Sequence, residues 1–206
     1  MTRPGIVIVD YGMANLRSVQ KAFEAVGHSA SVSADLDVIA GATKLVLPGV
    51  GAFPDAVAKL RETGLAAVIT RHIDAGSPFL GICLGLQLLF ARGFEDGVHA
   101  GLNVYPGDVV RFPPARGVKV PHMGWNTLRF TRPDCPLFAG LPPDPAVYFV
   151  HSYYAEPLDR ELVVAEADYP TPFCAATWRE NVFCTQFHPE KSQGVGLAML
   201  KNFAAL

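Results

Sequence analysis

Three short runs of apolar residues mark the first part of the chain, at residues 5–10, 44–48 and 78–82. Short apolar runs without polar alternation are typical of strands that are buried on both faces of a parallel sheet. Between these runs, apolar residues recur at spacings of three and four, which predicts helices. The alternation of such strands and helices predicts an α/β fold with a parallel sheet at its centre.

Local signals give the expected bounds of the helices. Asn15 is a residue type that caps helices, and Gly27 is a natural C-terminal stop, so the first helix is expected between them. Two further helices are expected over 54–62 and 65–75. A fourth, over 84–90, is expected to follow the third strand directly.

The pattern changes near Gly101, where prolines become frequent and short runs of strand-forming residues replace the helical periodicity. These runs, which look antiparallel and hairpin-connected, are residues 147–150, 162–165, 174–178 and 182–187. The last element, over 193–205, is predicted as an amphipathic helix that folds back on the sheet. The expected architecture is a three-layer α/β fold with a mixed sheet, in a single domain over residues 1–206.

Composition and charge argue against several classes of function. The chain has 206 residues, of which 17% are charged and 50% hydrophobic, so it can bury a full core without disulfides or metals. A net charge of −2 argues against nucleic-acid binding. The longest stretch without a charged residue, 75–91, is shorter than the about 20 residues of a membrane span. No secretory signal is recognisable in the first residues, so a cytoplasmic location is expected.

Most of the cysteines and three of the histidines are assigned no chemistry. The four cysteines form no CxxC pair, which argues against a disulfide scaffold or a zinc site. A turn at 180–181 would set Cys184 opposite Thr177, so Cys174 and Cys184 should not meet. Three histidines lie in polar contexts and are expected at the surface: His28, His72 and His99.

Residues 81–85, Gly-Ile-Cys-Leu-Gly, match the nucleophile-elbow pattern at a strand-to-helix turn. Glycines two residues on either side of Cys83 avoid collisions with the neighbouring strand and helix, while the sharp turn strains the central residue. The following helix directs its positive end at Cys83, which favours a thiolate. The alternative is an inert buried cysteine between packing glycines.

Residues 186–190, Gln-Phe-His-Pro-Glu, supply a base and a carboxylate at the end of a predicted strand. A thiolate nucleophile needs both partners. The proline between His188 and Glu190 suits a turn that brings the carboxylate to one ring nitrogen and leaves the other for Cys83. The alternative is a solvated turn with a capping histidine.

The segment 47–53 is a glycine-bearing loop after the second buried strand. It lacks the lysine and the spacing of phosphate-binding loops. An oxyanion loop is a better interpretation, in which the backbone N–H groups of Val50 and Leu84 converge on the developing oxygen. Gly49 lets the intervening peptide turn over at little steric cost.

Together the elbow, the Gln-Phe-His-Pro-Glu segment and the Pro-Gly-Val-Gly loop resemble the triad-type, class I glutamine amidotransferases, over essentially the whole chain. Further blocks resemble the branch of that family that serves histidine biosynthesis: residues 10–16, 121–126, 149–153 and 188–192. Ala14 departs from the glycine that many members carry. Other branches share the elbow and the His-Pro-Glu segment but lack the block at 121–126.

The resemblance implies a glutaminase without metal or cofactor, in which Cys83 attacks glutamine and His188, held by Glu190, moves the proton. It also implies that five residues hold the substrate: Gly51, Gln87, Glu95, Ser152 and Tyr153. For Glu95 the alternative is a solvated charge beyond the helix end.

The resemblance further implies a partner, a (β/α)₈ cyclase subunit in a heterodimer. This subunit would use the ammonia to make imidazole glycerol phosphate and aminoimidazole carboxamide ribonucleotide. Candidates for the docking surface are Asn15, His122, Met123, Trp125, Tyr148 and Lys191.

Alternatives remain for individual residues and for the whole chain. Trp125 could be a core aromatic, His122 a turn residue held by hydrogen bonds, and His151 a satisfied strand histidine without a catalytic role. The chain could also be the glutaminase subunit of another amidotransferase, a stand-alone thiol hydrolase or a non-catalytic binding module.

Overall fold

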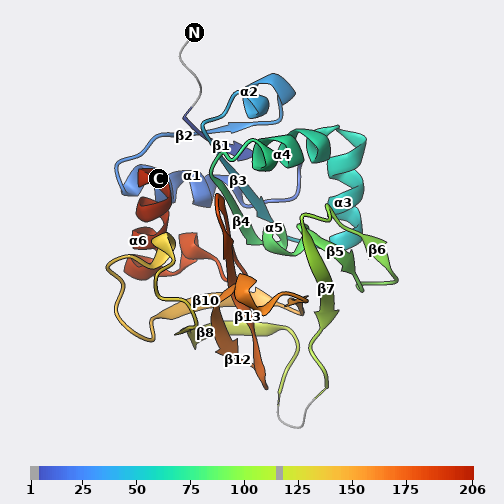
Figure 1. The fold of residues 1–206 in the computed structure, drawn as a ribbon, viewed down its shortest axis with the longest axis vertical. Coiled ribbons are helices and arrows are strands. Elements are labelled where there is room, and N and C mark those ends of the chain that lie inside the picture. The colour runs from blue at the N-terminus through green and yellow to red at the C-terminus, as the bar shows by residue number, and fades with distance from the viewer. Residues whose placement is uncertain (1–4, 115–117) are drawn as a thin grey trace.

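The computed structural model describes residues 5–114 and 118–206 and has a mixed α/β architecture (Figure 1). The first four residues, on which the expected absence of a secretory signal partly rests, lie outside the described residues. The main sheet has eight strands. Across the sheet their order is β2 Ala30–Ser33, β1 Ile6–Val9, β3 Lys44–Gly49, β4 Phe79–Cys83, β14 Val182–Thr185, β13 Pro172–Arg179, β12 Val163–Asp168 and β9 Arg129–Phe130.

The parallel half of this sheet confirms the three predicted apolar strands as β1, β3 and β4. The neighbour of β4 on its other side is β14, which runs parallel to β4 although it comes from the C-terminal half of the chain. The strands β12, β13 and β14 then pair antiparallel, as expected. The turn at 180–181 sets Thr177 opposite Cys184, and Cys174 and Cys184 are free thiols.

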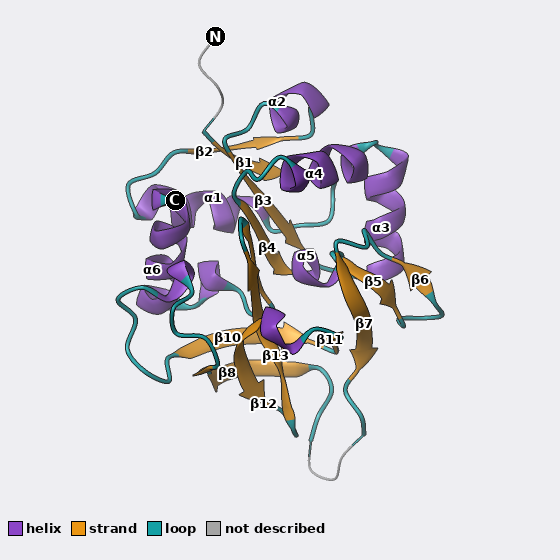
Figure 2. Cartoon of the chain, viewed as in Figure 1, coloured by secondary structure: helices purple, strands orange, loops and turns teal. Residues whose placement is uncertain are grey.

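Helices cover both faces of the sheet and make three layers (Figure 2). Ile6 and Ile8 of β1 belong to one core and Val7 and Val9 to the other, because successive strand residues point to opposite faces. The helices are α1 Leu16–Ala25 and α6 Gln193–Ala205 on the first core, and α2 Leu36–Ala40, α3 Phe53–Glu62 and α4 Leu65–Asp74 on the second. The predicted helices over 54–62, 65–75 and 193–205 are confirmed.

The predicted helix over 84–90 is too long. The helix α5 spans only Leu84–Gln87, and Phe90 begins the strand β5 Phe90–Gly93. All residues from 84 to 90 are buried, so the run has no polar face from which a period could be read. The strand β5 belongs to a second sheet, whose order is β11 Tyr153–Pro157, β7 Tyr105–Arg111, β5 and β6 His99–Ala100.

Two further strands, β8 His122–Thr127 and β10 Ala146–His151, form an antiparallel pair that we call the β8–β10 ribbon. The predicted strand 147–150 lies in β10, whereas β8 is not predicted. Burial alternates along both strands, so one face of the ribbon packs inward and the other is open.

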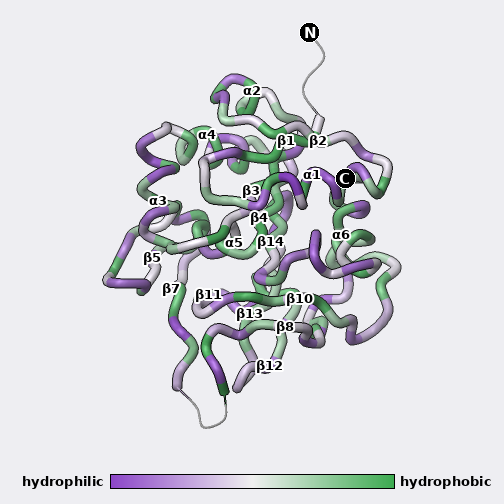
Figure 3. Tube along the Cα trace, turned by 180° about the vertical axis from the view of Figure 1, so that it is seen from behind, coloured by the Kyte–Doolittle hydropathy of each residue, from purple (hydrophilic) through white to green (hydrophobic). Residues whose placement is uncertain are grey.

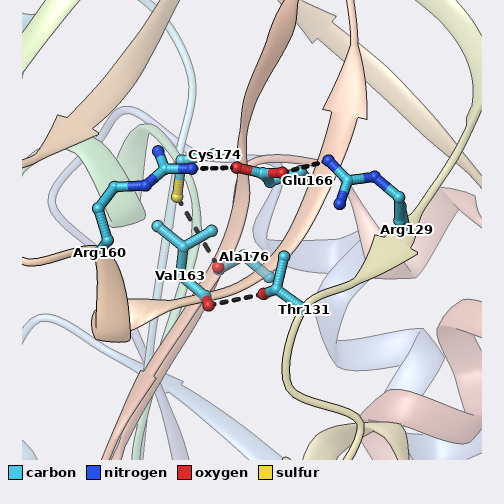
Figure 4. Close-up of polar contacts among 7 residues, drawn as sticks. All are labelled: Arg129, Thr131, Arg160, Val163, Glu166, Cys174 and Ala176. Carbon is cyan, nitrogen blue, oxygen red and sulfur yellow. Dashed lines mark hydrogen bonds and ion pairs between the residues drawn. The ribbon is translucent and has the colours of Figure 1, made fainter.

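Figure 3 shows hydrophobic positions concentrated on the central strands and hydrophilic ones on the outer turns. Glu166 of β12 is an exception, because this charged residue is buried. Its two carboxylate oxygens accept hydrogen bonds from Arg129 and Arg160, as Figure 4 shows. A paired and hydrogen-bonded carboxylate can be buried without an unmet charge. Within the described part of the chain, no helix has the length and apolar character needed to cross a bilayer.

His72, which is expected at the surface, is instead buried on α4 with 6% exposure. Its Nε2 lies 3.1 Å from the carbonyl oxygen of Pro78, and burial lowers the pKa of the ring. The expectation was wrong because His72 lies on the inward face of α4 together with Ile69 and Ile73. His28 and His99 are half-buried.

Candidate active site

The nucleophile elbow has the strained geometry that the sequence predicts. Cys83 ends β4 with φ 56° and ψ −109°, a region that non-glycine residues rarely occupy. A Cβ on Gly85 would lie 1.9 Å from the carbonyl oxygen of Leu47, and one on Gly81 would lie 2.8 Å from the carbonyl oxygen of Gly85. Both flanking positions therefore admit only glycine in this backbone.

The parallel pairing of β14 with β4 brings the His-Pro-Glu segment to the elbow. Ile82 is opposite Thr185, so the chain that follows β14 passes the end of β4, where Cys83 lies. His188 Nδ1 is 2.8 Å from Glu190 Oε1, and the two side chains are 3% and 1% exposed. His188 Nε2 is buried, and no hydrogen-bond partner for it lies among the described residues. The ring is thus held by one nitrogen, while the other is free for chemistry.

The charges around His188 favour its protonated form. Burial alone would lower the pKa of His188, but the Cys83 thiolate and the Glu190 carboxylate raise it, and the net shift is upward. A positive imidazolium beside the sulfur stabilises the thiolate, which is the nucleophilic form of a cysteine.

The loop after β3 does not direct its N–H group as the oxyanion prediction requires. The N–H of Val50 donates to the carbonyl oxygen of Met13, at 2.9 Å, and the Val50 side chain is 40% exposed. In this conformation the Val50 donor is occupied. The N–H of Leu84, at the first position of α5, has no acceptor within its own helix.

A cavity of about 210 Å³ lies beside Cys83. All five residues expected to hold glutamine line it, from segments that are far apart in the chain: Gly51, Gln87, Glu95, Ser152 and Tyr153. Leu84 lines it as well. The lining residues that sequence reasoning did not assign are Pro121, Val150 and His151. Polar side chains and the candidate nucleophile Cys83 both line the cavity, as a small polar substrate would require.

The amide of Gln87 connects the cavity wall to the elbow. Gln87 Nε2 donates to the carbonyl oxygen of Tyr153, at 2.8 Å, and to Gln186 Oε1, at 3.0 Å. Gln186 Nε2 is 3.7 Å from Cys83 Sγ. Sequence reasoning did not assign Gln186 a role, although it begins the Gln-Phe-His-Pro-Glu segment. With both N–H groups engaged, Gln87 has only its amide oxygen to offer a ligand.

Glu95 is a half-buried wall residue and not a solvated charge. Its Oε2 accepts a hydrogen bond from the backbone N–H of Phe53, at 2.7 Å. Phe53 is the first residue of α3, so the carboxylate also benefits from the positive end of that helix. The negative charge of Glu95 is thereby fixed at the cavity.

The open face of the β8–β10 ribbon carries several of the predicted docking residues. Met123 is 62% exposed and Trp125 is 50% exposed, so Trp125 is not a core aromatic. Trp125 makes an edge contact with Tyr148, and Lys191 Nζ lies 6.0 Å from the centre of the Tyr148 ring. Asn15, at the start of α1, is exposed and its side chain makes no capping bond.

His122, a candidate for the docking surface or for a turn residue held by hydrogen bonds, is a hydrogen-bonded residue of the strand β8. It is 4% exposed and lies on the inward face of the ribbon, because it alternates with the outward Met123 along β8. Its Nδ1 is 3.0 Å from His151 Nε2. His151 Nδ1 is in turn 2.9 Å from the carbonyl oxygen of Tyr153, so His151 is a satisfied strand histidine.

Comparison with solved structures supports the fold. A structure described as a glutamine amidotransferase superposes with a TM-score of 0.75 at 20% identity, and covers 97% of this chain and 99% of its own. PurLQS from Thermotoga maritima superposes with a TM-score of 0.71 at 21% identity, over 98% of this chain and 96% of its own. At this level of identity the likeness concerns the fold alone.

Comparison of sequences establishes the family. The model of the family described as "Glutamine amidotransferase class-I" matches residues 7–205. The imidazole glycerol phosphate synthase subunit HisH of Syntrophotalea carbinolica is 60% identical over 96% of this chain and 98% of its own length. That of Geobacter sulfurreducens is 52% identical over 98% of both. The chain therefore belongs to the class-I glutamine amidotransferase family and, within it, groups with the HisH subunits of imidazole glycerol phosphate synthase.

Proposed function

We propose that this chain hydrolyses glutamine to glutamate and ammonia with a Cys83–His188–Glu190 triad. We further propose that it delivers the ammonia to a (β/α)₈ cyclase subunit, which makes imidazole glycerol phosphate and aminoimidazole carboxamide ribonucleotide. One observation carries the catalytic part. In the segment that follows β14 past the elbow, Glu190 holds His188 through Nδ1, and the buried Nε2 has no hydrogen-bond partner among the described residues. The relatives' names support the biosynthetic role.

The reaction follows from these positions. The Cys83 sulfur attacks the carboxamide carbon of glutamine, and the carbonyl π electrons move onto the oxygen. Protonated His188 gives its proton to the departing nitrogen, and collapse of the intermediate breaks the C–N bond and leaves a glutamyl thioester. Water, deprotonated by His188, then attacks the thioester, so that glutamate leaves and the Cys83 thiolate is restored.

The oxyanion needs donors that this conformation supplies only in part. The N–H of Leu84 is at the start of α5, whereas the N–H of Val50 is bonded to Met13. For Val50 to stabilise the developing charge, its peptide with Gly49 has to turn and give up the Met13 bond. A donor that must first be released is a point at which a partner can control the reaction.

The cavity fits both ends of glutamine. The fixed carboxylate of Glu95 offers a counter-charge to the substrate ammonium, and the amide oxygen of Gln87 offers an acceptor. Gly51, Ser152 and Tyr153 complete the wall and face the substrate carboxylate in this proposal. No metal or cofactor takes part.

A partner subunit explains the exposed ribbon. Ammonia released into water is protonated and lost as a nucleophile, so a docked acceptor is required. Val150 lines the cavity and belongs to the ribbon, whose open face exposes Met123 and Trp125. Aromatic and methionine side chains of this kind are enriched in protein interfaces. We propose that the ribbon, with Asn15, Tyr148 and Lys191, docks on the cyclase.

The proposal also includes one glutaminase domain over residues 1–206, which the family match to residues 7–205 supports. A cytoplasmic location belongs to the proposal as well.

Glutamate release from glutamine tests the proposal. It is measured for the chain alone, with the cyclase subunit, and with the cyclase subunit plus its nucleotide, in wild type and Cys83→Ala. We expect strong activity only with the loaded partner and a loss of at least about 10³-fold in Cys83→Ala. Full activity of the isolated chain would indicate a stand-alone thiol hydrolase. Equal activity of wild type and Cys83→Ala would refute the triad.

A further inference from the structure

The inward face of the β8–β10 ribbon carries two buried histidines that the triad does not use. His122 is 4% exposed and His151 is 6% exposed. They lie opposite each other in the ribbon, with His122 Nδ1 3.0 Å from His151 Nε2. His151 also lines the substrate cavity. Two buried imidazoles in contact beside a substrate site need a physical account.

The hydrogen-bond partners determine which ring nitrogens carry protons. The carbonyl oxygen of Tyr153 can only accept, so His151 Nδ1, at 2.9 Å, must be the donor. In a neutral ring the Nε2 of His151 then accepts, and the donor to it is His122 Nδ1. The remaining His122 Nε2 accepts from Asn126 Nδ2, at 3.3 Å. Every ring nitrogen thus has a partner of the right kind, and the chain of bonds has one direction, from Asn126 to Tyr153.

Both rings are kept neutral by their surroundings. Burial lowers the pKa of His122 to about 4 and that of His151 to about 3. His122 stacks between Phe149 and Tyr169, with ring centroids 4.8 Å and 4.0 Å away. The positive charge of His188 also disfavours a charge on His151. Hydrogen bonds in such a dry aromatic setting fix geometry more firmly than bonds in water.

The last acceptor in this chain of bonds is a shared one. The carbonyl oxygen of Tyr153 accepts from His151 Nδ1 and also from Gln87 Nε2, at 2.8 Å. Gln87 donates its second N–H to Gln186, whose amide nitrogen is 3.7 Å from Cys83 Sγ. The Tyr153 carbonyl and Gln186 Oε1 together engage both N–H groups of Gln87, which leaves the amide oxygen for the cavity that Gln87 lines.

We infer that His151, oriented by His122, is a positioning residue for glutamine, because its Nδ1–H fixes the Tyr153 carbonyl and thereby turns the Gln87 amide oxygen toward the substrate. Neither histidine exchanges a proton with the substrate. This inference rests on the proposed glutaminase function, since it concerns the binding of that substrate.

Steady-state kinetics of the complex with the cyclase subunit and its nucleotide test the inference. His151→Leu removes the donor, and we expect the KM for glutamine to rise about tenfold while kcat changes less than about threefold. His151→Asn places an amide N–H close to the position of Nδ1, and we expect the KM to return to within about threefold of wild type.

His72 offers a matched control for His151. It is equally buried, at 6% exposure, and its ring also contacts a backbone carbonyl, that of Pro78, but it lies on α4 away from the cavity. His72→Leu should lower the melting temperature without changing the KM. A KM rise of the same size in both leucine variants would overturn the inference, as would a wild-type KM in folded His151→Leu or a failure of His151→Asn to improve on it.

A spectroscopic measurement makes the test independent of turnover. The ¹⁵N chemical shifts of the imidazole nitrogens in the wild-type chain should show both His122 and His151 neutral, with the proton on Nδ1. A proton on Nε2 of either ring would overturn the inference even if the chain were not a glutaminase. If His151→Leu does not fold, His122→Phe keeps the stacking with Phe149 and Tyr169. It should raise the KM and abolish the fixed tautomer of His151, and an unchanged KM and tautomer would overturn the inference.

Discussion

Two glycine-bearing turns meet at the candidate active site, the elbow at Cys83 and the loop after β3. They differ in how firmly the fold positions the group that each would contribute to the reaction. The elbow holds Cys83 in a strained backbone conformation at 6% exposure, between glycines that have no room for a side chain. The loop after β3 leaves Val50 40% exposed and its N–H bonded to Met13. The nucleophile is therefore positioned by the fold, whereas one of the two proposed oxyanion donors is not.

This difference has a physical cause. The elbow connects β4 to α5, two elements that are buried on every side, so packing maintains the strain at Cys83. Val50, which follows β3, is 40% exposed, and its N–H donates a backbone hydrogen bond to the carbonyl oxygen of Met13. A bond of that kind contributes about 0.5–1.5 kcal/mol, which a docking partner can readily offset. On the proposed mechanism, we expect activity to be controlled at the Val50 loop rather than at Cys83.

The largest expected effect comes from a substitution in the proposed triad. Glu190→Gln keeps the shape of the side chain but weakens its hold on the His188 tautomer, and we expect kcat to fall about 10³-fold. Glutamate release by the complex measures it. Glu180→Gln neutralises an exposed carboxylate and should change kcat less than about twofold. Comparable losses in the two variants would contradict the triad.

A stability effect follows from the close packing at the elbow. Gly85→Ala forces a Cβ to within 1.9 Å of the Leu47 carbonyl oxygen, and we expect unfolding to become easier by about 3 kcal/mol. Gly194→Ala, where nothing lies within 4 Å of the new Cβ, should change stability by less than about 1 kcal/mol. Denaturant unfolding of both variants measures the difference. Equal stabilities would show that the elbow is not rigid.

A substitution in the loop after β3 is expected to have a smaller effect on kcat. Val50→Pro removes one N–H, and we expect kcat of the complex to fall about 10²-fold with little change in KM, since the donor acts on the oxyanion. Val50→Ala retains the N–H and should stay within about threefold of wild type. A fully active Val50→Pro variant would mean that the loop supplies no oxyanion donor.

The smallest expected effect is a shift in titration. Because the thiolate contributes to the raised pKa of His188, Cys83→Ala should lower that pKa, which NMR titration of the imidazole measures. Because folding raises the pKa of His188, this residue stabilises the folded state fully at pH values below its ordinary pKa of 6.5. The stabilisation is lost as the pH rises through the raised pKa. Wild type should therefore lose more stability than Cys83→Ala above pH 6.5. Identical titrations would show that the sulfur and the ring are not coupled.

The parts of the fold that could be predicted share one property, which is that their signal is local. Apolar runs indicated β1, β3 and β4, and helical spacing indicated α3, α4 and α6. Five of the strands that the sequence did not predict are β2, β7, β11, β5 and β8, and the last two show why. The strand β5 continues a run of buried residues without a period, and β8 contains histidine, glycine and asparagine, whose burial alternates only in the folded ribbon.

The candidate site divides in the same way. The sequence predicted the elbow glycines, Cys83 and the His-Pro-Glu segment, because the steric and chemical requirements of each motif involve residues within a five-residue segment. The bond between Val50 and Met13, the place of Gln186 beside Cys83 and the His122–His151 pair were not, because each joins segments that are distant in the chain.

The sequence by itself thus determined the α/β class and indicated the candidate nucleophile and the candidate base with its carboxylate, since periodicity and turn chemistry are short-range properties of a chain. Only the tertiary structure decided that β14 lies parallel to β4, that the Val50 donor is occupied and that His122 faces inward. These three outcomes depend on which strands pair and in which register, and a one-residue change of register would have turned every side chain of a strand to the other face.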